Sequence, residues 1–84
     1  MTPADILPQL RQFVADNFLY MRRDATIGDD DSLLARGVID SLGVMELVGF
    51  VETTFGVAVD PADITEEHFG SLSAIARYVA SRTV

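Results

Sequence analysis

A serine stands where a long irregular segment gives way to a helical pattern. Residues 37–47 read GVIDSLGVMEL, in which Ser41 lies between Asp40 and Leu42. A serine at a helix start can cap the helix, act as a nucleophile, or carry a covalently attached group. The neighbouring side chains, and the elements that position them, indicate which of these three roles Ser41 has.

Nucleophilic catalysis by Ser41 finds little support in the sequence. A serine nucleophile needs an adjacent base, an acid that orients this base, and donors for an oxyanion. The chain has a single histidine, His68, which we expect at the surface or at a helix end. Ser41 follows the residues VID rather than the glycine-rich turn of a nucleophile elbow. We therefore expect no catalytic residue and no enzymatic activity.

The acidic run from Asp29 to Asp31 suggests a calcium loop. However, Leu33 stands where such a loop needs an oxygen ligand, and no glutamate follows at the required distance. The chain also has no cysteine for a thiolate site. We expect a solvated turn here and no metal site.

Asp40 is a favourable N-cap, because its carboxylate can accept from the free N–H groups of the first turn. This leaves the Ser41 hydroxyl free and directed outward. A phosphate ester on that oxygen would lie at a helix N-terminus, where unpaired N–H groups and the helix dipole favour anions. The tripeptide Asp-Ser-Leu is weak support by itself, since it also occurs by chance.

Helical periodicity defines the elements around Ser41. The first helix could start with Thr2 as cap and Pro3 as first residue, but Pro8 would then lie inside it at a cost of about 3 kcal/mol. We therefore expect a start at Asp5, which places Pro8 in the first turn, where its missing N–H is no loss. The second is expected from Ser41 to about Phe55, ended by Gly56. Its inward stripe is predicted to be core: Val44, Leu47, Val48, Val51 and Phe55. Its outward face carries Leu42, Glu46, Gly49 and Thr53, with Met45 at the flank.

The rest of the chain completes an all-α prediction. The long first loop, about residues 20–40, is expected to be pinned to the core by Ile27, Leu33, Leu34, Val38 and Ile39. Helix starts at Asp60–Pro61 and Thr65–Glu66 leave room for only a turn or two before Gly70. Ser71 then caps a last helix with Leu72, Ile75, Ala76 and Val79 facing inward. We predict a small four-helix bundle, three main helices and a short third one.

Length and charge limit the function. The 84 residues allow one domain, residues 1–84. A net charge of −7, from thirteen acids against six arginines, disfavours nucleic acid and anionic membranes. No apolar run approaches the roughly 20 residues of a membrane span, and the first residues lack a signal-peptide pattern. We expect a cytoplasmic protein that is a monomer and binds no membrane.

Beyond these patterns, residues 33–59, LLARGVIDSLGVMELVGFVETTFGVAV, resemble the phosphopantetheine attachment region of acyl and peptidyl carrier proteins. The Gly-x-x-Asp-Ser-Leu core of that family is matched from Gly37 to Leu42, and its preceding leucine by Leu33 or Leu34. The Glu-Leu-Val of the following helix and a Phe-Gly pair at its end also match. Residues 63–82 resemble the short third helix, Phe-x-Ser turn and closing helix of carriers, so the resemblance runs from about residue 5 to 82.

The resemblance implies a carrier with no chemistry of its own. A phosphopantetheinyl transferase would attach 4′-phosphopantetheine from coenzyme A to Ser41, flanked by Asp40 and Leu42. An acyl- or aminoacyl-activating ligase or adenylation enzyme would then load the arm with a thioester. Downstream synthase, condensing or tailoring enzymes would be the further partners. Partner contacts are expected on the outward face of the second helix, at Leu42, Met45, Glu46, Gly49 and Glu52, although Met45 could instead rim the core.

The subtype and one rival remain open. The DSLGVMELV helix and the DITEEHFGSL segment resemble freestanding aminoacyl or peptidyl carriers of secondary metabolism, including the D-alanyl type. A polyketide or fatty acyl carrier is the alternative within the family. The chain departs from the fatty-acid carriers at Gly43 and Gly49, where acids or larger residues are common in those proteins. Each glycine should also weaken the helix by roughly 1 kcal/mol against alanine. Outside the family, the rival is an unmodified helical interaction module.

Overall fold

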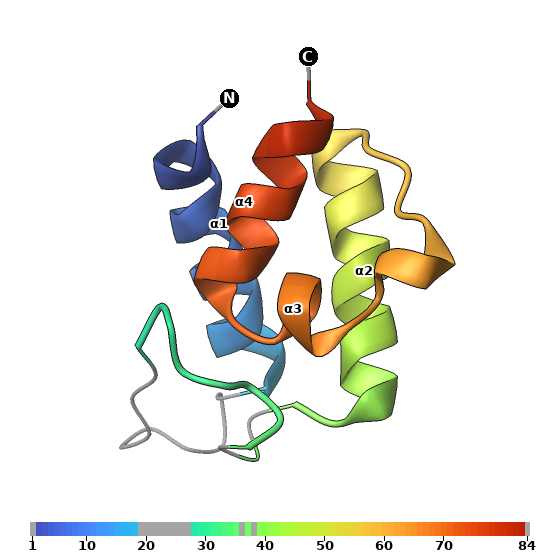
Figure 1. Cartoon of the computed structure of the whole chain (residues 1–84). Coiled ribbons are helices and arrows are strands. Elements are labelled where there is room, and N and C mark those ends of the chain that lie inside the picture. Colours follow the sequence, from blue (N-terminus) through green and yellow to red (C-terminus); the bar gives the residue numbers. More distant parts are fainter. Residues whose placement is uncertain (1, 19–27, 36, 38, 84) are drawn as a thin grey trace.

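The computed structural model describes residues 2–18, 28–35, 37 and 39–83. Its elements are α1 (Pro3–Phe18), α2 (Ser41–Phe55), the 3-10 turn η1 (Pro61–Asp63), α3 (Glu66–Phe69) and α4 (Leu72–Arg82). Figure 1 shows α1 beside α4, with α2 on the other side of α4 and the short α3 crossing the front. No strand occurs in these described ranges, which confirms the prediction of an all-α bundle with three main helices and a short third one.

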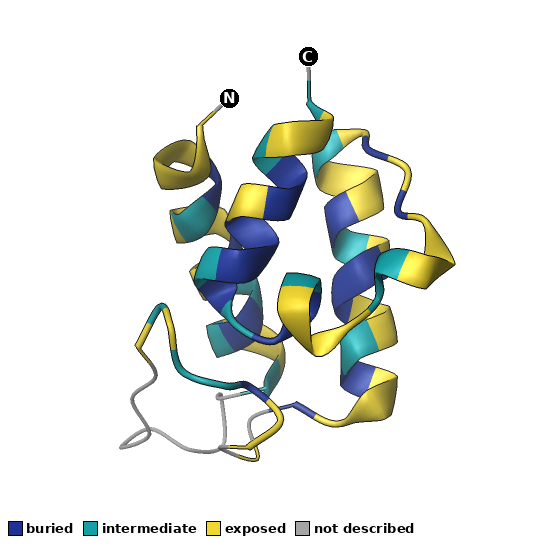
Figure 2. Ribbon diagram, in the orientation of Figure 1, coloured by how far each residue is buried: buried dark blue, intermediate teal, exposed yellow. Residues whose placement is uncertain are grey.

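The core lies between the facing sides of the three long helices (Figure 2). It contains Ile6, Leu10 and Val14 of α1, Leu47, Val48 and Val51 of α2, and the four predicted inward residues of α4, Leu72, Ile75, Ala76 and Val79. The remaining two residues of the predicted α2 stripe, Val44 and Phe55, are only half-buried and pack against this core. The stripe therefore faces inward as predicted, but its two ends are not enclosed.

The predicted start of α1 at Asp5 is wrong, because the helix begins at Pro3. Thr2 occupies the cap: its carbonyl accepts from the N–H groups of Asp5 and Ile6 at 3.0 and 3.2 Å. In return the Asp5 carboxylate accepts from the Thr2 backbone N–H at 3.0 Å and from its hydroxyl at 2.9 Å. This reciprocal capping satisfies the start of the helix two residues earlier than expected and offsets part of the cost of Pro8, which lies inside α1 and cannot donate an intrahelical hydrogen bond.

Phenylalanine rings fill the space between α1 and α2. Phe13 stacks on Phe50 with ring centroids 4.2 Å apart, and it meets the edge of Phe18 at 6.0 Å. Phe50 meets Phe55 edge-on at 6.1 Å. The contacts form a continuous chain of aromatic rings that joins the two helices.

The described part of the first loop is anchored in the core by Leu33 and Ile39. The prediction that Leu34 is also pinned there is wrong, since this side chain is exposed; Ile27 and Val38 lie outside the described residues. Asp29 pairs with Arg11, and Asp31 accepts a 2.7 Å hydrogen bond from the Gly28 N–H. Within the described ranges no cluster of three histidine, cysteine or acidic residues could hold a metal ion.

Side-chain caps fix the turns that follow α2. Asp60 caps η1, Thr65 caps α3 and Ser71 caps α4, as the sequence predicted. Gly56 ends α2 with a left-handed φ of 68°. Among the described helices, none combines the length and apolar character that crossing a membrane would need.

Candidate functional site

Asp40 caps α2 and thereby fixes the place of Ser41. Its carboxylate accepts from the Gly43 N–H at 2.8 Å, and its carbonyl accepts from the Val44 N–H at 2.9 Å. Ser41 is therefore the first residue inside the helix, as predicted. The N–H groups of this first turn have no acceptor within the helix, so the local field favours an anion.

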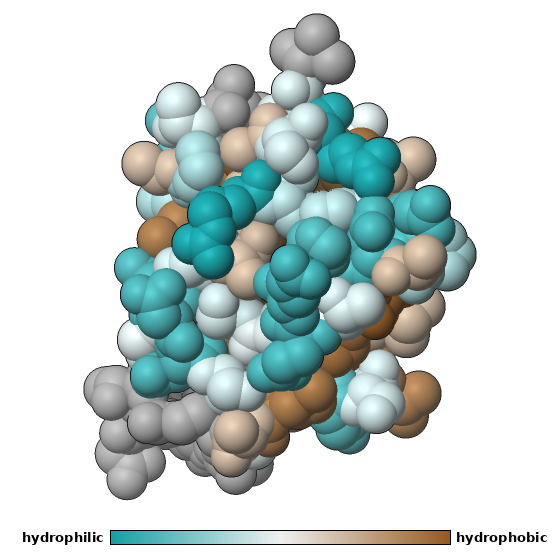
Figure 3. Space-filling view, viewed as in Figure 1, coloured by the Kyte–Doolittle hydropathy of each residue, from teal (hydrophilic) through white to brown (hydrophobic). Residues whose placement is uncertain are grey.

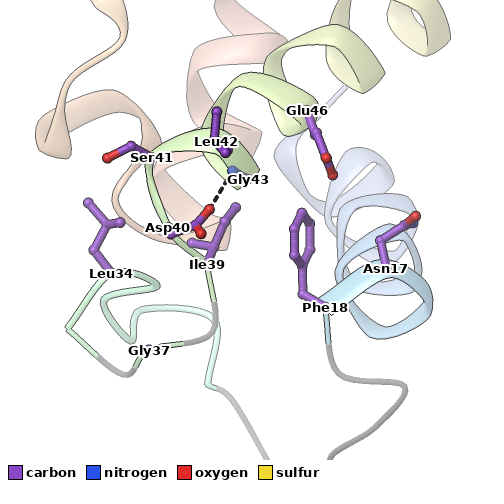
Figure 4. A pocket seen from close by; sticks show the side chains of 10 residues that line it. All are labelled: Asn17, Phe18, Leu34, Gly37, Ile39, Asp40, Ser41, Leu42, Gly43 and Glu46. Atoms are coloured by element: carbon purple, nitrogen blue, oxygen red, sulfur yellow. Dashed lines mark hydrogen bonds between the residues drawn. The ribbon is translucent and has the colours of Figure 1, made fainter.

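The Ser41 side chain is exposed and takes no part in the cap. Figure 4 shows its hydroxyl directed away from the bond between Asp40 and Gly43, on the side of Leu34. Within the described part of the chain, no side chain or backbone group forms a hydrogen bond with this hydroxyl. The oxygen is thus open to solvent, and the expectation of an outward hydroxyl is confirmed.

Two hollows meet at Ser41, and Leu34 also lines both of them. The larger, of about 690 Å³, is open to solvent and is further lined by Asn17, Phe18, Gly37, Ile39, Asp40, Leu42, Gly43 and Glu46. The smaller, of about 230 Å³, lies between α2 and α3 and is further lined by Val44, Met45, Ile64, Thr65, Glu66 and Phe69. Figure 3 shows a hydrophobic strip between these two helices.

Exposed apolar side chains surround the hydroxyl. Leu34, Leu42 and Met45 are 46%, 76% and 55% exposed, and they are the large hydrophobic residues most exposed to solvent in the described ranges. We call these three residues the apolar rim. Met45 therefore projects into solvent rather than closing the core. Sequence reasoning did not place Leu34 in the partner site, because the pair Leu33–Leu34 gives no sign of which leucine is buried.

The other predicted partner residues divide into two groups. Glu46 lines the larger hollow beside Ser41. Gly49 and Glu52 lie further along α2, where Gly49 is exposed with open space at the position of a Cβ atom. One oxygen of Glu52 accepts a 3.0 Å hydrogen bond from the Val59 N–H, which holds the segment after α2. Glu52 thus has a structural role that its position in the sequence did not reveal.

Gly43 also differs from its sequence interpretation. The sequence suggested only a residue that weakens the helix, whereas the structure buries it against Ile39 and Phe18. A Cβ atom at this position would lie 2.5 Å from Ile39 Cγ1, which is far too close for two carbon atoms. The glycine is therefore a packing requirement at the start of α2.

His68 lines neither of the hollows that contain Ser41. It lies in α3, as expected for a helix-end residue, with its ring centroid 5.2 Å from that of Tyr78. A separate hollow of about 430 Å³ contains His68, Tyr78, Asp63 and Arg82. The hydrogen bond from the Tyr78 hydroxyl, together with Arg82, lowers the pKa of Asp63. The single histidine of the sequence therefore lies away from Ser41, and the two residues form no serine–histidine pair.

A comparison with known protein families adds to this geometry. The family model described as "Phosphopantetheine attachment site" matches residues 9–79, which include most of α1, all of α2 and α3, and most of α4. No curated protein matches the chain significantly.

Proposed function

Because the chain belongs to the phosphopantetheine attachment-site family of carrier proteins, we propose that Ser41 bears the arm and that its cargo is an aminoacyl or peptidyl group. Proteins of this family are non-catalytic carriers, 4′-phosphopantetheine is their prosthetic group, and they interact with a phosphopantetheinyl transferase and biosynthetic enzymes. Membership decides against the unmodified interaction module considered from the sequence.

The observation that carries the assignment to Ser41 is its exposed hydroxyl in the first turn of a helix that Asp40 already caps. In the transfer, the Ser41 oxygen bonds to the phosphorus of the phosphopantetheinyl group, the adenosine bisphosphate part of coenzyme A leaves, and the hydroxyl loses its proton. The helix start favours the resulting phosphodiester anion. Leu42 and Leu34 flank it with apolar surface.

The attached group fits the residues present. It supplies a terminal thiol that holds cargo as a thioester, and the chain itself has no cysteine that could compete for the cargo. The open hollows on both sides of Ser41 leave the phosphodiester unobstructed. The protein's part is to hold the attachment point in a fixed orientation and to present it to enzymes.

Partner recognition is proposed for the apolar rim and for the acids beside it, Asp40 and Glu46. Exposed apolar residues among acids favour a partner with an apolar hollow and basic residues around it. The net charge of −7 supports attraction to such surfaces. The proposed contact extends along α2 to Gly49, where the missing side chain lets a partner approach closely, and to Glu52.

Intact mass measurement tests the attachment. The protein is incubated with coenzyme A and a broad-specificity phosphopantetheinyl transferase, with Ser41→Ala as control. We expect the wild type to gain one phosphopantetheinyl group and the variant to gain none. An unmodified wild type, or equal modification of Ser41→Ala, would overturn the assignment.

The aminoacyl or peptidyl cargo rests on the likeness of the α2 and α3 sequences to freestanding carriers of that kind. A polyketide or fatty acyl cargo is the alternative. The modified protein should be offered separately to amino-acid adenylation enzymes and to acyl ligases or acyltransferases. Loading by adenylation enzymes alone supports the proposal, and loading by acyl-transferring enzymes alone contradicts it.

A further inference from the structure

The first turn of α2 lies directly on two side chains that leave no room for a Cβ atom at position 43. Such an atom would lie 2.5 Å from Ile39 Cγ1 and 2.9 Å from Phe18 Cε1. Carbon atoms in contact are roughly 3.5–4 Å apart. Because Ile39 Cγ1 lies close to its own backbone, the conflict cannot be relieved by moving only the end of a flexible side chain.

Both supporting side chains are themselves anchored. Ile39 is 4% exposed, and its N–H donates to the Leu33 carbonyl at 3.4 Å. Phe18 is the last residue of α1 and packs edge-on against Phe13. The start of α2 is therefore supported by the end of α1 and by the end of the first loop. Figure 4 shows Ile39 and Phe18 below this turn.

Ser41 lies two residues before Gly43 in the same turn, and the N–H of Gly43 donates the capping bond to Asp40. A shift of the turn at Gly43 therefore moves the hydroxyl and strains the cap together. Relieving a 2.5 Å contact requires a displacement of roughly 1 Å. The displacement would also change where Ser41 stands relative to Leu34, which belongs to the loop rather than to α2.

We propose that Gly43 is a positioning residue for phosphopantetheine transfer. It lets α2 settle on Ile39 and Phe18, and this contact fixes the hydroxyl of Ser41 relative to the apolar rim. The inference rests on the proposed attachment at Ser41. Gly49 provides the contrast within the same helix: nothing lies within 4 Å of a Cβ atom built there, so its lack of a side chain has no comparable role in packing.

The test measures transfer from coenzyme A by a broad-specificity phosphopantetheinyl transferase, as kcat/KM, for wild type and Gly43→Ala. Val79→Ala is the stability control, because Val79 is fully buried in the last turn of α4, at the opposite end of the bundle from the start of α2 (Figure 1). All proteins are assayed at a temperature where circular dichroism shows them folded. The amide chemical shifts of Ser41 and Leu42 are recorded in parallel.

We expect Gly43→Ala to lower kcat/KM about tenfold, since misplacement by roughly 1 Å can cost up to about 100-fold. Val79→Ala should stay within about twofold of wild type, because its cavity lies away from the site. The double variant Ile39→Ala/Gly43→Ala removes the closer of the two contacts and leaves only the one with Phe18 Cε1, an atom at the end of its side chain. It should recover part of the rate and return the Ser41 amide shift toward its wild-type value.

Three results would overturn the inference. A wild-type rate for Gly43→Ala, with Ser41→Ala unmodified, refutes positioning and leaves the attachment intact. Equal losses in Gly43→Ala and Val79→Ala assign the effect to stability alone. If the wild type itself gains no phosphopantetheine, the proposed function fails and the positioning role fails with it.

Discussion

The Tyr78 hydroxyl donates a 2.8 Å hydrogen bond to the carboxylate of Asp63, and so joins the middle of α4 to η1. Arg82 adds a second bond to the same carboxylate oxygen at 2.7 Å and lies over the Tyr78 ring. The chain continues from Asp63 into Ile64 and α3, which form one wall of the smaller hollow beside Ser41. A contact distant from the hydroxyl in sequence therefore holds part of its surroundings.

The pair between Tyr78 and Asp63 predicts a loss of stability in acid. The bond from Tyr78 lowers the pKa of Asp63 below its ordinary value of 3.8. A lowered carboxyl pKa contributes stability that is complete above the ordinary value and is lost as the pH falls through the lowered one. Tyr78→Phe should therefore be less stable near neutral pH and should lose less stability in acid. Urea unfolding across this pH range measures both effects.

The same variant has an alkaline signature. Burial, and then the bond to Asp63, raise the pKa of Tyr78 above its ordinary value of 10.0. A raised tyrosine pKa contributes stability that is complete below the ordinary value and is lost as the pH rises through the raised one. Tyr78→Phe should remove this alkaline loss. If the free energy of unfolding depends on pH identically in wild type and variant, in both acid and alkali, the pair of Tyr78 and Asp63 contributes nothing to stability.

Leu42 provides a test of the apolar rim. Because its side chain is 76% exposed, Leu42→Ser should leave the free energy of unfolding within about 0.5 kcal/mol of wild type. If the rim binds the phosphopantetheinyl transferase, removing Leu42 should weaken this binding by more than about 1 kcal/mol. The KM of the transferase for the variant should then rise more than fivefold, with little change in kcat. Ala58→Ser, exposed in the segment after α2, is the matched control. Unchanged KM for Leu42→Ser would exclude a contact at this residue.

The cap of α1 makes a prediction for stability. Thr2→Ala removes the side chain that exchanges hydrogen bonds with Asp5. The loss should lower the free energy of unfolding by about 1 kcal/mol. Thr53→Ala, on the exposed face of α2, should have little effect or stabilise slightly because alanine favours helix. Equal stability of Thr2→Ala and wild type would show that the first turn of α1 frays in solution.

The two glycines of α2 predict opposite changes. Gly49→Ala should raise the free energy of unfolding by about 1 kcal/mol, because alanine favours helix and the position is open. Gly43→Ala should lower it, since the close contacts with Ile39 and Phe18 outweigh the same gain in propensity. Chemical denaturation of both variants provides the comparison. Stabilisation by both would mean that the start of α2 shifts without cost.

Local patterns in the sequence were sufficient for the elements from α2 onward and for their caps. The aspartate at 40, the glycine at 56 and the serine at 71 act on neighbouring backbone groups, so their roles could be read from adjacent residues. The start of α1 differs from the prediction because the reciprocal hydrogen bonds of Thr2 and Asp5 hold the first turn although Pro8 lies inside the helix. That pair is also local, since the two residues are three apart in the chain.

The sequence by itself determined the helical class, the first-turn place of Ser41 and the likeness to carrier proteins, since all three depend on residues close together in the chain. Tertiary structure decided which leucine of the pair joins the rim, what Glu52 holds, and why position 43 has no side chain. Leu34 and Phe18 reach the start of α2 from other segments. Their distances follow from packing across the core, which the spacing of residues along one helix cannot specify.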